Sequence, residues 1–426
     1  MLIFKKEKWH TWFYYAEGKA QLEELYGSTE DAGERYLNVF DKFCEAFGYE
    51  ECAFFSAPGR MELSGNHTDH QHGYVLAGSV SLDMVAAVLP RKDKKVRIVS
   101  EGYPMTEIEL DNLSPVEAEK NTTAALVRGI AAGFAGRRFG YGGFDAYIDS
   151  NIPIGSGLSS SAAIEVLLGT IMNVIYNNGN AYEASLAVIG QYAENDFFGK
   201  PSGLMDQMSI ACGGVSFIDF SGGDFNLRYV DTDFHYLGWE ICVVNAGGSH
   251  DGLTAEYAAI TKEMGEAAQF FGKNVLSEVD EAEFYASISD MRNKVSDRAI
   301  VRAMHFYTEN ARVLKQLTAL KNYDIGTYRE LMLESGHSSY EKLQNVYPSG
   351  NENERSLSLA LGLSEHILSG KGAWRVHGGG FAGTIQALVP LDLLDEYVAQ
   401  MEAVFGAGSV YRLRIRNFGG YCFDLV

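Results

Sequence analysis

Two patterns of apolar spacing divide the first part of the chain. Over residues 1–45, apolar side chains recur every three or four positions, which predicts an N-terminal helical extension. The residues that carry this pattern are Leu22, Leu25, Tyr26, Tyr36, Leu37, Val39, Phe40 and Phe43. Between 83 and 113 the apolar runs become continuous or alternating, which is typical of strands. We expect these strands at 84–89, 96–99 and 107–111.

Helical and strand patterns are mixed along the rest of the chain. The expected helices lie near 115–136, 161–176, 181–196 and 391–406, with a long helical region at 251–370. Glycine pairs after position 210 punctuate short strands. Further strands are expected at 240–245 and 384–389. This mixture predicts an α+β protein with one domain at 46–220 and a second at 221–426.

The composition and charge exclude several classes of protein. Hydrophobic residues at 46% and charged residues at 21% are ordinary for a globular protein, and no apolar run reaches the roughly 18 to 20 residues of a membrane span. A net charge of −21 repels nucleic acids and anionic lipids, so we expect neither as a partner. The N-terminus lacks a secretory signal pattern, and the five cysteines show no paired spacing. We therefore expect a cytoplasmic protein with reduced thiols.

Arginines alternate with apolar residues at 411–416, near the C-terminus. A period of two would place Arg412, Arg414 and Arg416 on one face of a strand. Because the whole chain is acidic, we expect this face to offset the negative surface rather than to bind nucleic acid.

The segment 151–165, NIPIGSGLSSSAAIE, has the composition of an anion-binding loop. Gly155 and Gly157 allow the backbone to approach a phosphate, and three serines precede an apolar run that is typical of a buried helix. The segment lacks the lysine of the common nucleotide-binding loop and the third glycine of a dinucleotide-binding loop. A nucleotide-using enzyme is therefore the first hypothesis, and an ordinary loop with a helix cap is the alternative.

Three further segments carry candidate chemistry. Residues 57–76 combine Arg60, Glu62, Asp69 and several histidines between glycines, which suits a polyhydroxylated ligand. The histidines at 67, 70 and 72 with Asp69 also allow a transition-metal site, which we consider less favoured. The other two segments are 193–207, with a turn and several acids, and 376–384, with a GGGF loop.

Taken in this order, the four segments resemble those of the galactokinases of the GHMP kinase superfamily, which transfer the γ-phosphoryl group of ATP to small molecules. The resemblance extends from about residue 45 to the C-terminus. It implies a two-domain α+β fold, the GHMP kinase fold, with the active site in the cleft between the domains. It also implies ATP and Mg²⁺ as cofactors and a small-molecule sugar as substrate.

The resemblance also implies roles for individual residues. Asp206 corresponds to the catalytic aspartate and Arg60 to the arginine beside it, while Ser161 and Glu194 correspond to the Mg²⁺-contacting pair. The phosphate-binding positions are Gly155, Ser156, Gly157, Leu158, Ser159, Ser160 and Ser161. The sugar-binding positions are Asn66, His67, Asp69, Gly203, Asp206 and Tyr257, the last within a segment at 245–257 that includes Ser249 and His250. We therefore expect a kinase that phosphorylates the anomeric C1 hydroxyl of galactose or a related sugar.

Several departures from the family pattern concern the substrate. The family sequence Asn-Leu-Ile-Gly-Glu-His is replaced by Glu62-Leu-Ser-Gly-Asn66-His67, so Asn66 stands where a glutamate meets the sugar's 6-hydroxyl. An amide there suits a sugar with a carboxylate at carbon 6, such as galacturonate, which is one alternative substrate. His70, His377 and Ala382 are further departures. A non-catalytic sugar sensor is a second alternative, which the intact serine-rich loop disfavours.

Overall fold

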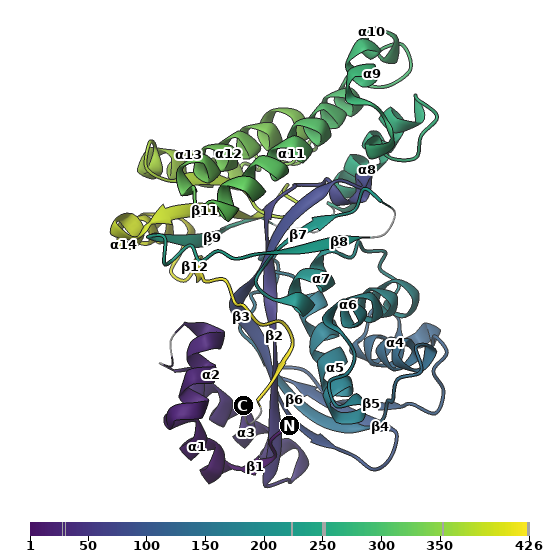
Figure 1. Ribbon diagram of the computed structural model, residues 1–426, viewed down its shortest axis with the longest axis vertical. Coiled ribbons are helices and arrows are strands. Elements are labelled where there is room, and N and C mark those ends of the chain that lie inside the picture. Colours follow the sequence, from purple (N-terminus) through teal and green to yellow (C-terminus); the bar gives the residue numbers. More distant parts are fainter. Residues whose placement is uncertain (28, 30, 223–224, 249–252, 352, 424–426) are drawn as a thin grey trace.

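The computed structural model describes residues 1–27, 29, 31–222, 225–248, 253–351 and 353–423, and contains two β-sheets with helices packed on them (Figure 1). The larger sheet has the strand order β1-β2-β3-β6-β4-β5, with β7 joined to β3, β8 joined to β7 and β13 joined to β2. Its strands are β1 (Phe4–Lys5), β2 (Glu51–Ser64), β3 (Tyr74–Pro90), β4 (Lys95–Ser100), β5 (Thr106–Glu109), β6 (Phe144–Ser150), β7 (Val215–Asp219), β8 (Asn226–Val230) and β13 (Tyr421–Cys422).

The two long strands β2 and β3 form the centre of this sheet. Side chains alternate between its faces, so that Phe54 and Phe55 enter different hydrophobic clusters. The register between the strands shifts on both sides of Arg60, between Pro58 and Arg60 and between Glu62 and Ser64. Such irregularities re-aim side chains. They occur in the same segment that carries the candidate chemistry.

Helices cover both faces of the larger sheet. One face packs against α4 (Thr123–Gly136), α5 (Ser160–Asn177), α6 (Glu183–Tyr192) and α7 (Met205–Cys212), with η3 (Ala193–Phe198) between the last two. The other face packs against α1 (Lys6–Tyr14), α2 (Ala16–Tyr26) and α3 (Ala32–Phe47), whose buried residues include Trp9, Tyr36 and Phe43. Residues 1–45 are therefore mainly helical, as the apolar spacing predicts, while their separation as an extension stays a prediction.

The second sheet has the order β10-β11-β9-β12 and supports the helical half of the molecule (Figure 1). Its strands are β9 (Trp239–Gly247), β10 (Ala373–Val376), β11 (Gly383–Pro390) and β12 (Val410–Leu413). The helices of this half are α8 (Thr254–Gln269), α9 (Glu281–Ala286), α10 (Ile288–Met291), α11 (Asp297–Lys321), α12 (Ile325–Ser338), α13 (Ser356–Leu368) and α14 (Leu394–Phe405). Short helical turns are η1 (Asp69–Gln71), η2 (Glu117–Glu119), η4 (Leu276–Glu278), η5 (Ser339–Leu343) and η6 (Leu391–Leu393).

The last residues return to the larger sheet, where β13 pairs with β2. The expectation of a strand carrying three arginines is wrong, because β12 ends at Leu413 and contains only Arg412 of the three. Arg416 has no exposed surface and donates to Asp83 at 2.9 Å. This arginine is buried because it neutralises a carboxylate that is itself buried. The predicted domain boundary at 220 stays a prediction, and β8, just beyond it, still pairs with β7.

Candidate active site

The serine-rich segment forms a loop that leads directly into α5. Gly155, Gly157 and Ser159 have φ angles of 75°, 72° and 58°, which turn the backbone sharply before the helix begins at Ser160. No side chain caps this helix end. The first-turn amides of an uncapped 18-residue helix and its positive dipole end are suited to bind an anion.

Arg60 and Asp206 form a bidentate ion pair beside this loop. The guanidinium Nε and Nη2 atoms donate to the two carboxylate oxygens at 2.7 and 2.8 Å, although the residues lie 146 positions apart. Arg60 Nη1 also donates to the carbonyl of Gly157, and the Ser159 hydroxyl donates to Asp206. The predicted catalytic pair is therefore in direct contact with the predicted phosphate loop.

The surroundings of Asp206 keep its carboxylate ionised. Burial alone would raise its pKa, but Arg60 and the hydrogen bond from Ser159 outweigh burial and hold the pKa below its ordinary value. The side chain is still 30% exposed. A substrate can therefore reach an anionic, fixed carboxylate.

The predicted sugar contacts converge on the same region. The pKa of Asp69 is raised by burial and, to a smaller extent, by the charge of Asp206, which brings these two acids into one electrostatic environment. A side chain at Gly203 would lie 3.1 Å from Asp69 Oδ2, so a glycine leaves the space in front of this carboxylate open. Tyr257 donates to the carbonyl of Gly380 at 3.0 Å. Ser249 and His250 lie outside the described residues.

Asn66 is the exception among these residues, because it has no exposed surface. Its Nδ2 donates to the Gly378 carbonyl at 2.7 Å and lies 3.2 and 3.3 Å from the two Glu62 carboxylate oxygens. Its Oδ1 accepts from Asn345 at 2.9 Å and from Ser339 at 3.3 Å. The prediction that Asn66 contacts the sugar stays a prediction, and its amide already has protein partners on every side.

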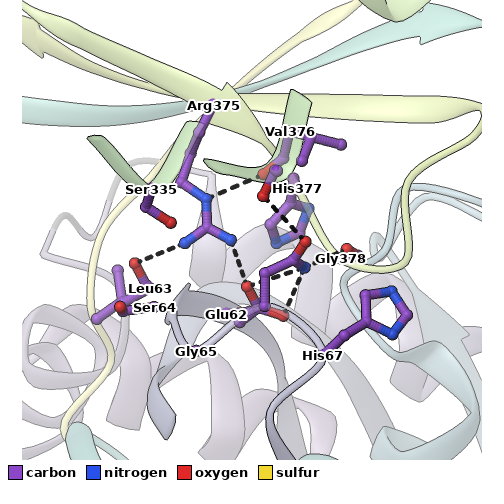
Figure 2. Close-up of polar contacts among 12 residues, drawn as sticks. Glu62, Leu63, Ser64, Gly65, His67, Ser335, Arg375, Val376, His377 and Gly378 are labelled. Atoms are coloured by element: carbon purple, nitrogen blue, oxygen red, sulfur yellow. Dashed lines mark hydrogen bonds and ion pairs between the residues drawn. The ribbon is translucent and has the colours of Figure 1, made fainter. Parts of the chain in front are cut away.

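Glu62 connects the two halves of the molecule through a buried ion pair with Arg375 (Figure 2). Arg375 Nη2 donates to Glu62 at 2.5 Å, and Nη1 donates to the Leu63 carbonyl at 3.3 Å. Both side chains are almost fully buried. Figure 2 shows His67 to one side of this pair, beyond Gly378. An ion pair between β2 and β10 therefore lies beside the loop that contains His67.

Helix α11 fixes the same loop from the helical half. His305 Nε2 lies 2.9 Å from the Asn66 carbonyl, and Glu309 accepts from the Gly65 amide at 3.2 Å. Burial raises the pKa of Glu309, but Arg312 and other nearby cations and donors reverse this and bring it to about 2. Burial lowers the pKa of His305 to about 4. Glu309 is therefore charged and His305 neutral at neutral pH.

Ser161 and Glu194 have properties that suit Mg²⁺. The Ser161 side chain is exposed on the first turn of α5, whereas Glu194 is buried and accepts from Lys200 at 2.8 Å. Gln207 donates to Glu194 and to Glu165, each at 2.9 Å, and Glu165 lies one turn beyond Ser161. A carboxylate that already attracts an ammonium group and an exposed hydroxyl are oxygen ligands of the kind taken by a hard cation that keeps water and phosphate ligands.

The alternative of a transition-metal site in the histidine-rich loop gains no support. Within the described residues, no group of three or more His, Cys, Asp or Glu is arranged to hold a metal ion. Burial lowers the pKa of His70 to about 3, so this ring is neutral. Its Nδ1 lies 3.2 Å from Gln71 Nε2.

Sequence reasoning missed the residues that support the site from the helical half, chiefly His305, Glu309 and Arg375. The spacing did contain a signal. His305, Glu309 and Arg312 recur at helical intervals, so that one face of α11 carries ionisable groups although it is buried. Buried ionisable groups are rarely present without partners, so this face could have been identified as a polar interface.

Comparisons with known proteins find similar sequences and structures among the kinases. Two family models match the chain, the GHMP kinases N terminal domain at residues 125–214 and the galactokinase galactose-binding signature at residues 41–90. The chain is similar to the crystal structure of galactokinase from Lactococcus lactis complexed with galactose. That match has 26% identity and a TM-score of 0.77, and it covers 92% of this chain and 100% of that one.

Two more distant solved structures share the fold. The mevalonate kinase of Methanococcus jannaschii has 15% identity and a TM-score of 0.62, over 85% of this chain and 98% of that one. A D-glycero-D-manno-heptose 1-phosphate kinase from Bacteriodes thetaiotaomicron has 14% identity and a TM-score of 0.59, over 88% of this chain and 99% of that one. None of the helices within the described ranges is long and apolar enough to cross a membrane. The fold is the two-domain α+β kinase fold, and the chain carries an N-terminal GHMP kinase domain and a galactokinase galactose-binding signature.

Proposed function

We propose that this sugar kinase transfers the γ-phosphoryl group of ATP to the anomeric C1 hydroxyl of galactose or a closely related galacto-configured sugar. The observation that supports it most strongly is the contact of the Arg60–Asp206 pair with the phosphate loop through Gly157 and Ser159. This contact brings an ionised carboxylate next to the segment expected to bind the triphosphate. Phosphoryl transfer depends mainly on such positioning and on charge stabilisation.

In this proposal, the C1 hydroxyl oxygen forms a bond to the γ-phosphorus while the bond from that phosphorus to the β,γ-bridging oxygen breaks. The products are a sugar 1-phosphate and ADP. Asp206 accepts the hydrogen bond of the C1 hydroxyl, orients its oxygen and takes up its proton as the new bond forms. Arg60 keeps Asp206 ionised and offsets negative charge on the transferring group.

Other residues would bind the substrates. Asp69 accepts hydrogen bonds from two adjacent sugar hydroxyls, with Gly203, His67 and Tyr257 completing the sugar site. The uncapped start of α5 and the loop from Gly155 to Ser161 receive the phosphates. Ser161 and Glu194 would hold Mg²⁺, which neutralises charge on the β- and γ-phosphate oxygens.

Galacturonate is not favoured over galactose by the contacts at Asn66. The amide donors that would meet a substrate carboxylate are already engaged by Gly378 and Glu62. The only cation beside them, within the network drawn in Figure 2, is Arg375, which has no exposed surface and pairs with Glu62. No specific contact among the described residues thus supports a uronic acid substrate.

The test is the formation of sugar 1-phosphate from galactose and Mg-ATP by the parent chain and by Asp206→Asn. We expect kcat to fall by about 100-fold or more in the variant, on the order expected for loss of acid–base assistance. Asp196→Asn is the matched control, because Asp196 is an exposed acid on the neighbouring η3. Equal activity of Asp206→Asn and parent would refute the role of Asp206, and ATP turnover without a sugar phosphate would refute the proposed reaction.

A further inference from the structure

The acid and the amide at positions 62 and 66 have exchanged places relative to the family sequence. The family has asparagine at the first position and glutamate at the second, whereas this chain has Glu62 and Asn66. The structure brings the two side chains into contact, at 3.2 and 3.3 Å. The chain therefore has the same two chemical groups, which contact each other here, but its carboxylate lies four positions earlier than in the family sequence.

The exchanged carboxylate is unavailable to a ligand. Glu62 is almost fully buried and pairs with Arg375, which has no exposed surface itself (Figure 2). A buried carboxylate requires such a partner, because an unpaired charge in the interior is strongly destabilising. The negative charge is thereby neutralised inside the protein.

The exchanged amide has no remaining hydrogen-bonding capacity. An asparagine side chain offers two N–H donors and two acceptor positions on its oxygen. Gly378 and Glu62 receive the two donors, and Asn345 and Ser339 fill the acceptor positions. His305 lies within hydrogen-bond distance of the backbone carbonyl of the same residue. With every polar side-chain atom engaged and no exposed surface, Asn66 cannot donate to or accept from a ligand in this conformation.

We propose that Asn66 is a structural residue and that this kinase does not recognise the 6-hydroxyl of its sugar through position 66. The kinase therefore accepts galacto-configured sugars whether or not they carry that hydroxyl. This inference rests on the proposed function and on the resemblance, which implies that a glutamate at position 66 meets the 6-hydroxyl of the sugar. Recognition then depends on the ring hydroxyls and C1, through Asp69 and Asp206. The substrate class comprises galactose and its 6-deoxy analogue.

The test compares galactose with 6-deoxygalactose by calorimetric titration and by product formation with Mg-ATP. We expect dissociation constants and kcat/KM values for the two sugars to agree within about threefold, because no protein group is left unpaired when the hydroxyl is absent. A preference for galactose of about tenfold or more would overturn the inference, since that is the size of one lost hydrogen bond to a charged group.

The double variant Glu62→Asn/Asn66→Glu restores the family order and serves as the converse test. We expect it to prefer galactose over 6-deoxygalactose by about 10- to 100-fold, as a carboxylate at 66 regains a hydroxyl partner. The parent comparison does not depend on the folding of this variant. If galactose binds and reacts but 6-deoxygalactose does not, the inference alone fails. If both sugars bind equally and neither is phosphorylated, the inference stands and the proposed function fails.

Discussion

At the scale of single residues, the planar guanidinium of Arg60 determines the state of Asp206. Two parallel N–H···O bonds fix the carboxylate, and a third N–H reaches the Gly157 carbonyl. A lysine ammonium is a point charge and cannot make this set of contacts together. The geometry of the pair, and not only its charge, links the carboxylate to the loop.

We therefore expect Arg60→Lys to lower kcat by about 100-fold, because orientation and charge stabilisation are both impaired while a positive charge remains. Arg128→Lys is the matched control. Arg128 makes the same two-bond pair with Glu119, at 2.7 and 2.6 Å, and takes no part in the site. Steady-state kinetics with galactose and ATP measure both variants, and an unchanged kcat in Arg60→Lys would contradict the role of the bidentate pair.

At the scale of elements, the loop before α5 depends on backbone conformations that few residues adopt. Gly157 has a φ of 72°, and a Cβ there would lie 3.1 Å from His377 Nδ1 on the opposite half of the molecule. The loop is therefore enclosed between α5 and the β10–β11 hairpin. An added methyl group must displace either the loop or the His377 ring.

Gly157→Ala should raise the KM for ATP by about tenfold or more, because a small displacement of the amides weakens phosphate binding. Gly179→Ala is the control that separates weakened phosphate binding from the backbone strain that an alanine causes at a positive φ angle. Gly179 follows the other end of α5 with a φ of 74°, and no atom of the described residues lies within 4 Å of the position that its added methyl group would occupy. Both variants should lose about 1 to 2 kcal/mol of unfolding free energy, but only the first should alter the KM for ATP.

At the scale of the whole molecule, many helices and strands could be predicted because they depend on local spacing, but strands β2 and β6 were not expected. Apolar periodicity alone predicts the helices that contain Trp9 and Tyr36, and it predicts the strands at 84–89 and 240–245. Contacts between distant segments could not be derived in this way. The meeting of Arg60 with Asp206 was expected only from the family motifs, and the burial of Asn66 depends on Asn345 and Ser339, hundreds of positions away.

Buried histidines make the stability of the whole molecule depend on pH. Burial, assisted by Arg60 and Arg375, lowers the pKa of His377 from 6.5 to about 3. Between these values the unfolded chain binds a proton that the folded chain does not, so the unfolding free energy falls as the pH falls. The stability that neutral His377 supplies is therefore complete above 6.5 and is lost progressively toward 3.

His377→Thr should make this dependence shallower by about 1.4 kcal/mol per pH unit between about pH 5.5 and 4.5. Urea denaturation at a series of pH values measures the slope. His366→Gln, at an exposed position on α13, is the control and should leave the slope as in the parent. Parallel slopes for His377→Thr and parent would contradict the assignment of a neutral, buried ring.

The return of the last residues to the first sheet has a consequence for synthesis of the protein. Arg416 neutralises the buried Asp83, and Phe423 fills the aromatic cluster beneath the N-terminal helices. A nascent chain that does not yet include these residues lacks both contacts, so its first half cannot complete its core until residues 416–423 have been synthesised. A stop codon placed before position 416 should therefore yield unfolded polypeptide that proteases remove, instead of a shortened but working enzyme.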